Sequence, residues 1–316
     1  MYLSNTFRES PQTLVAVLLL IGLMQYVGAP TQTNAAITKR VYLTSGTSWT
    51  VPNDWVSGNN TIEAIGAGAH GGAGTRFTSG IGGAGGGYAK ISNLSLTGGA
   101  SVSYRVTTLS DTVFNSTATT CAGAPTPSVC AKASGGSAAL SIGTVKYTGG
   151  SGSTGGAGNS GGGGGGAAGP GGNGNAGTSG SSNGGAGGSG GAGAGGAGGA
   201  GDDSGFTAGN GGIGREYDFI PGHGSGGGGG GGQYANVIDF IPGGDGGNGG
   251  LYGGGGGGGG SASGEIDSFM RGARGDGAPG LIVITYESTD TGSPSQAKVK
   301  ILGGQVKIIG GRVLIK

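Results

Sequence analysis

Short segments that carry aromatic, acidic and basic residues lie between the glycine runs of this sequence. Two of them contain the same pentapeptide, Asp-Phe-Ile-Pro-Gly, which begins at Asp218 and again 21 residues later at Asp239. Aromatic rings stack on sugars, and carboxylate or guanidinium groups orient hydroxyls through charge-assisted hydrogen bonds. These residue types, displayed on loops over a rigid support, predict a recognition surface. The candidate contact residues are Tyr217, Asp218, Phe219, Tyr234, Asp239, Phe240, Phe269 and Arg271.

A plainer interpretation of the same segments stays open. The apolar residues of the two pentapeptides, Phe219, Ile220, Phe240 and Ile241, would then only cap the ends of the glycine-rich region and exclude water. One loop could serve both purposes.

No arrangement of residues in the sequence predicts catalysis. His70 and His223 stand alone among glycines, without a nucleophile beside them, and we expect both to be exposed to solvent. The many GxGxxG strings are not placed between a strand and a helix, as a dinucleotide site requires. We therefore expect a protein that is not an enzyme and that has no cofactor and no metal site.

Cys121 and Cys130 are the only cysteines. They predict a small disulfide-closed loop if the protein matures outside the cytoplasm, and two free thiols if it does not.

Glycine supplies 89 of the 316 residues, which is typical of a low-complexity or disordered chain. The runs at 161–166, 226–232 and 253–260 break the every-third-residue pattern of collagen. Glycine runs can also form polyproline II-type helices, whose backbone groups are all free to bond neighbouring helices. An ordered polyglycine II bundle is worth considering where both ends of the glycine block belong to one sheet, and the flanking sequence predicts that they do.

Strand signals surround the glycine-rich block. They begin at Arg40, Ser48, Asn60, Tyr88, Ser101 and Thr144, between glycine, serine and asparagine turns, and indicate a small antiparallel β domain. The apolar stretch Leu281 to Tyr286 predicts a strand that returns to this domain and closes it. The fold class is thus mainly β with an inserted polyglycine II bundle. The expected divisions are 1–36, 37–148, 149–280, 281–287 and 288–316.

The two ends of the chain have patterns of their own. Leu14 to Met24 is an apolar run of 11 residues, typical either of a cleaved signal peptide or of a retained hydrophobic helix over residues 11–28. At the other end, Val-Lys-Ile-x-Gly-Gly units with a period of seven predict short strands joined by tight turns. Unpaired strand edges favour pairing with other copies, and a homotrimer would close them.

Charge narrows the choice of partners. The chain has 16 basic and 15 acidic residues, so it has no net field that would attract nucleic acid. Membrane contact is expected only through residues 11–28. The five basic residues of the tail leave membrane-surface binding open as a second interpretation of that segment.

The stretches "ITKRVYLTSGTSWTVPNDW" from Ile37 and "GAPGLIVITY" from Gly277 carry a family resemblance. Residues 37–286 resemble the glycine-rich domain of bacteriophage tail-fibre proteins, and the middle is similar to phage adhesins with polyglycine II sandwiches. This resemblance implies a virion protein that binds a host-surface glycan or protein through loops at the bundle tip and that contacts other virion subunits. The alternative is a secreted or anchored bacterial surface protein that forms a filament. An ice-binding protein is a third interpretation, which the charged and aromatic interruptions disfavour.

Overall fold

The structure is a computed structural model that describes residues 36–288, with gaps at 157–159, 181–182, 192–194, 202–207, 218–222, 234–241 and 263–270, together with two short C-terminal strands. Ile37–Thr289 forms one compact unit. Met1–Ala36 and Asp290–Lys316 form a second unit. The predicted helix over residues 11–28 lies outside the described residues. Those that are described include no helix with the length and hydrophobicity needed to cross a bilayer.

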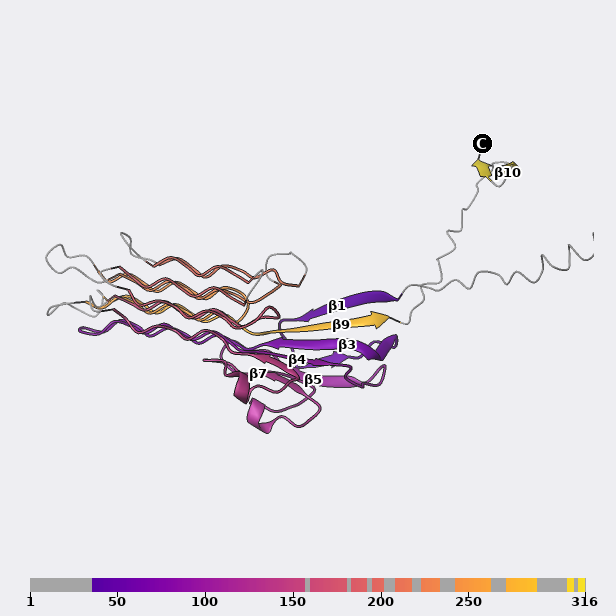
Figure 1. Ribbon diagram of the computed structural model, residues 1–316, viewed down its shortest axis with the longest axis horizontal. Helices are drawn as coiled ribbons and strands as arrows, with labels where there is room; N and C mark the ends of the chain where they lie inside the picture. Colours follow the sequence, from indigo (N-terminus) through magenta and orange to yellow (C-terminus); the bar gives the residue numbers. More distant parts are fainter. Residues whose placement is uncertain are drawn as a thin grey trace, which may run out of the picture. The chain divides into compact units, whose positions relative to one another are not determined.

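The first unit is mainly β, with two antiparallel sheets and almost no helix (Figure 1). The five-stranded sheet has the order β1 (Ile37–Leu43), β9 (Leu281–Ser288), β3 (Trp55–Ile65), β4 (Tyr88–Ser92) and β8 (Val145–Tyr147). The four-stranded sheet has the order β2 (Ser48–Thr50), β5 (Ser101–Arg105), β6 (Thr112–Phe114) and β7 (Val129–Ala131). Two short 3-10 turns, Cys121–Gly123 and Ala138–Leu140, complete the regular structure of this unit. The predicted strands are confirmed, and β6 and β7 are additional.

A hydrophobic core fills the space between the two sheets. The alternation of apolar residues along β3 and β9 places Ile62, Ile282 and Ile284 on one face, where all three are fully buried. The smaller sheet supplies Phe114, also fully buried, and Val102. Burial of these side chains is what fixes the register of each strand, because a slip by one residue would turn them to the opposite face.

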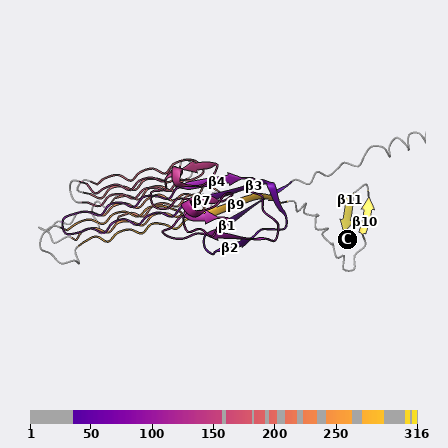
Figure 2. The same ribbon diagram turned by 90° about the horizontal axis from the view of Figure 1, so that it is seen from below.

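Strand β9 lies in the interior of the five-stranded sheet, although it follows the glycine-rich block in the sequence. It pairs with β1 on one side, with Leu43 opposite Ile282, and with β3 on the other, with Ile65 opposite Leu281. The glycine-rich block follows β8 and ends at β9, which both belong to the five-stranded sheet, so the block is an insertion with both ends fixed. The segments run side by side away from the sheets (Figures 1 and 2).

The backbone of residues 161–168 follows a cycle of three. Successive amides donate hydrogen bonds to three different neighbouring segments, and the fourth amide returns to the first neighbour. The same cycle continues in residues 226–232 and 254–260. The first set of donor and acceptor pairs is Gly161 to Gly232, Gly162 to Gly80, Gly163 to Thr178, Gly164 to Gly229, Gly165 to Gly83, Gly166 to Asn175, Ala167 to Gly226 and Ala168 to Gly86.

These segments pack too closely for side chains. A Cβ atom on Gly164 would lie 2.3 Å from the carbonyl oxygen of Gly255, and one on Gly163 would lie 2.0 Å from that of Ala186. Gly255 and Ala186 do not belong to the three segments that accept hydrogen bonds from the amides of residues 161–168. Residues 161–168 therefore contact further segments through their Cα atoms. Residues 160–169 are all buried. Glycine is therefore required by close backbone approach, and backbone contacts take the place of a side-chain core.

Polar side chains occupy the surface segments instead. Asn210 Oδ1 accepts a hydrogen bond from Asn248 N at 2.8 Å, and Asn248 Oδ1 accepts one from Asp276 N at 2.7 Å. Asp245 Oδ1 likewise accepts one from Ala273 N at 2.6 Å. Each side chain satisfies an amide on a neighbouring surface segment, which explains why asparagine and aspartate interrupt the glycine there.

The C-terminal tail contains two strands, as the sequence predicts. β10 (Val306–Ile309) pairs with β11 (Arg312–Ile315) in antiparallel register, with Ile309 opposite Arg312 across the Gly310-Gly311 connection.

Candidate functional site at the far end of the glycine segments

The glycine segments have two distinct ends. At the near end, Ala167 and Ala168 pack against Ile65 and Leu281 of the five-stranded sheet. At the far end, Gly161 donates to Gly232, one segment length away from those alanines. Any loop that precedes or follows a segment can thus be assigned to one end.

Tyr217 belongs to the near end. Its side chain is 8% exposed and packs with Tyr88 and Val283, while its ring meets that of Tyr42 edge-on at 6.4 Å. Arg40 donates a hydrogen bond to the carbonyl oxygen of Tyr217. This position corrects the expectation that Tyr217 is a surface contact for a receptor. The side chain instead fastens a glycine loop to the sheet.

His223 lies beside the same loop and is not a solitary exposed histidine, as the sequence suggested. Its ring stacks on Tyr42, with the centroids 3.8 Å apart and the planes at 11°. His70 is also partly covered, and its Nδ1 accepts a hydrogen bond from Gly277 N at 3.1 Å. Both histidines therefore have structural contacts and no nucleophile beside them among the described residues.

Two carboxyl groups lie at the near end, of which Glu63 is buried and Glu216 is partly buried. Burial raises the pKa of Glu63 above its ordinary value, although a hydrogen bond from Tyr88 opposes this shift. Burial also raises the pKa of Glu216, which accepts hydrogen bonds from the backbone amide and the hydroxyl of Ser225. No described pocket opens onto these groups. They are consistent with a structural junction between the sheet and the glycine segments.

The far end carries the described residues best placed for recognition. Arg76 lies over the ring of Phe77, with its guanidinium carbon 4.9 Å from the centroid, and Phe77 is 65% exposed. Arg271 is exposed and precedes Gly272. The carbonyl oxygen of Gly272 accepts a hydrogen bond from the amide of Gly74, which lies just before the loop that carries Arg76 and Phe77. We call Arg76, Phe77 and Arg271 the far-end group. It combines an exposed aromatic face with two guanidinium groups.

The two copies of the repeated pentapeptide flank one glycine segment, residues 225–232. Its near end, at Gly226, donates to Tyr252, and its far end, at Gly232, accepts from Gly161. The first copy precedes this segment and the second follows it. The described residues that flank the two copies therefore lie at opposite ends of the region, and the copies themselves lie outside the described residues.

Most of the sequence-predicted contacts lie outside the described residues, and only their flanks are placed. Tyr217, which precedes Asp218 and Phe219 in the sequence, lies at the near end. The stretches that contain Tyr234, Asp239, Phe240 and Phe269 are flanked by far-end residues. Sequence reasoning missed Arg76 and Phe77. The signal was present in "TRFTSG", an interruption of the glycine pattern with the same mixture of basic and aromatic residues.

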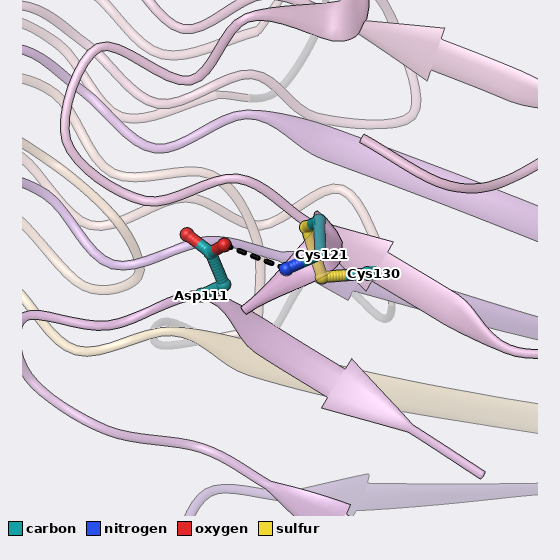
Figure 3. A group of neighbouring side chains, drawn as sticks. All are labelled: Asp111, Cys121 and Cys130. Carbon is teal, nitrogen blue, oxygen red and sulfur yellow. Dashed lines mark hydrogen bonds between the residues drawn. A yellow bond between two sulfur atoms is a disulfide. The ribbon is translucent and has the colours of Figure 1, made fainter. Parts of the chain in front are cut away.

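The two cysteines form a disulfide, which resolves the alternatives left by the sequence. Asp111 lies beside it, is 3% exposed, and accepts a hydrogen bond from Cys121 N at 2.9 Å (Figure 3). It also accepts one from Ala133 N at 2.8 Å. Lys132 Nζ lies 3.1 Å from the same carboxylate. Because both sulfur atoms are bonded to each other, they are not available as thiolate ligands, and the cluster is a structural clamp.

No protein-family model matches this chain, and no curated protein matches it.

Proposed function

We propose that this chain is a non-enzymatic structural and adhesion protein of a bacteriophage particle, part of a tail fibre or another surface appendage. The observation that carries the proposal is the position of the far-end group. An exposed aromatic ring and two arginines lie at the end of the glycine segments remote from the sheets. This is the arrangement that a host-surface glycan or protein would meet first.

We also propose that the glycine segments are polyglycine II helices. The hydrogen-bond cycle of three supports this, because a polyproline II-type helix has three residues per turn and directs successive amides to three sides. At a rise of about 3.1 Å per residue, an eight-residue segment would hold the far-end group roughly 22 Å from the sheet junction. A rigid support of this kind keeps loops in fixed positions, which lowers the entropy lost on binding.

Assembly forms the remaining part of the proposal. The tail strands pair with other copies in a homotrimer, which removes exposed edges, and residues 11–28 contact other virion subunits or a membrane. The protein would then reside in the extracellular particle. The competing function is a secreted or anchored bacterial surface protein that forms a filament, and the disulfide is compatible with both.

Two measurements test the proposed function. The first is detection of the chain in purified virions by mass spectrometry, since its absence there would favour the bacterial surface protein. The second is adsorption to host cells by particles that carry Arg76→Ala and Phe77→Ala. We expect slower adsorption with unchanged particle assembly.

The matched control for adsorption is Arg215→Ala, because Arg215 is an exposed arginine of the near-end loop. Equal adsorption by the far-end variant and this control, with both proteins folded, would show that the far-end group only caps the segments.

A further inference from the structure

A second site lies in the β unit, apart from the far-end group. We propose that the pocket beside Arg105 binds the carboxylate of an acidic sugar. The pocket has a volume of about 500 Å³ and lies between β2, β5 and the loop that follows β6. This volume is in the range of small-molecule sites and exceeds what a single inorganic anion fills.

Arg105 supplies the positive charge of the pocket. Its Nε atom is buried and has no hydrogen-bond partner among the described residues. Its Nη2 atom makes one long hydrogen bond, 3.3 Å from Ser110 Oγ. A buried donor without a partner is costly, and an acceptor on a bound ligand would satisfy it.

Among the described residues, no carboxylate competes for this guanidinium, because no acidic residue lines the pocket. Asp111, the buried acid near this sheet, already accepts hydrogen bonds from Lys132, Cys121 N and Ala133 N. The arginine is thus left for an anion from outside, and its planar fork suits a carboxylate.

The remaining wall favours a sugar over a bare anion. It includes six serine and threonine residues, whose hydroxyl groups can each donate and accept. Ser116 Oγ already accepts from Ala118 N at 3.0 Å, so its proton is available for a ligand. These residues are Thr47, Ser48, Ser103, Thr107, Ser116 and Thr117.

The loop that closes the pocket is held in place. Ser116 N donates to Ser103 O at 3.2 Å, and Asn115 Nδ2 donates to Pro127 O at 2.6 Å. Val113, the cross-strand partner of Arg105, packs against the two disulfide-bonded residues, Cys121 and Cys130. A pre-formed wall of this kind reduces the cost of ordering the site when a ligand binds.

The test is a titration of the full chain with glucuronate, measured by isothermal titration calorimetry or by ligand-observed NMR. Glucose is the neutral match and inorganic sulfate is the bare anion. We expect saturable binding of glucuronate, with weaker binding of both other probes. Arg105→Gln should weaken glucuronate binding about ten- to a hundredfold. The affinity of Arg105→Lys for glucuronate should lie between that of the unaltered chain and that of Arg105→Gln, because the charge remains and the planar fork is lost.

Arg215→Gln is the control, since it removes an exposed arginine of the near-end loop, and it should bind glucuronate like the unaltered chain. If Arg105→Gln does not fold, Thr117→Val removes one wall hydroxyl and should weaken binding several-fold. The proposal is overturned by no saturable binding, by equal binding of glucose or sulfate, or by unchanged affinity in folded Arg105→Gln.

Discussion

The hydroxyl group of Tyr88 donates a hydrogen bond to Oε1 of Glu63, and both side chains are buried where the five-stranded sheet meets the glycine segments. A carboxylate in this place is poorly solvated, so the folded chain holds the proton of Glu63 more tightly than the unfolded chain does. The junction therefore contains a group whose charged form opposes folding.

This relationship predicts a pH dependence. The stability that comes from protonated Glu63 is fully present below its ordinary pKa of 4.5 and is lost as pH rises through the raised folded pKa. Glu63→Gln should remove this loss. Relative to the unaltered chain, its melting temperature should rise most at neutral pH, and each unit of pKa difference corresponds to about 1.4 kcal/mol.

Thermal unfolding of both proteins between pH 4 and 8 checks this expectation. Tyr88→Phe offers a second comparison, because it removes the hydrogen bond that lowers the pKa of Glu63, and should move the stability loss to higher pH. Parallel melting profiles for Glu63→Gln and the unaltered chain would contradict the prediction.

Alanine at Gly164 should destabilise the protein. Its Cβ would lie 2.3 Å from the carbonyl oxygen of Gly255, and overpacking typically costs about 1–3 kcal/mol. In a disordered glycine chain the same change would be neutral or slightly stabilising, so the sign of the effect reports order. Gly58→Ala is the control, because a Cβ there has no atom within 4 Å. Denaturant unfolding of both variants gives the comparison.

Hydrogen exchange addresses the same segments without mutation. The amides of residues 161–168, 226–232 and 254–260 donate to neighbouring segments and are buried, so we expect slow exchange there. Exchange at the rate of a free peptide would show that these hydrogen bonds do not persist in solution.

Removal of the disulfide should lower stability by about 2–3 kcal/mol, the value expected for a loop of this length. The sequence separation of Cys121 and Cys130 is 9 residues. The double change Cys121→Ser and Cys130→Ser, compared with the unaltered chain with and without reductant, measures it. Reductant should bring the unaltered chain to the level of the variant and leave the variant itself unchanged.

Tyr217→Ala should act on stability. The side chain is buried between the sheet and a glycine loop, and truncation of a large buried aromatic residue costs about 3–5 kcal/mol. Phe77→Ala is the matched comparison, because this ring is 65% exposed and should contribute little to folding. Equal melting temperatures for the two variants would contradict the placement of Tyr217 in the junction.

The strands were predictable because their residues alternate between apolar and polar positions, and Leu281 to Tyr286 has the continuous apolar pattern of an interior strand. β6 and β7 were not predicted, and their three-residue length is not the reason, because β2 and β8 are equally short and were predicted. The close approach of glycine segments follows from glycine itself, which has no Cβ atom.

The end at which each loop lies could not be predicted. Tyr217 and Phe77 both interrupt glycine-rich sequence, and nothing local distinguishes them. The end at which each residue lies depends on how many times the chain has reversed direction before that residue. One chain reversal predicted wrongly would therefore assign every later loop to the opposite end. Arg105 was overlooked because its importance comes from a missing partner, which is a property of three-dimensional packing.

The interior position of β9 has a consequence for the order in which the protein can be made. Among the described strands, the only neighbour of β1 in its sheet is β9, with Leu43 opposite Ile282. β1 therefore has no partner strand until the whole glycine-rich block has been synthesised. Such distant pairing gives a high contact order, which slows folding. A nascent chain interrupted before Leu281 would lack the strand that joins β1 to β3, so the five-stranded sheet can be completed only after translation has passed that point.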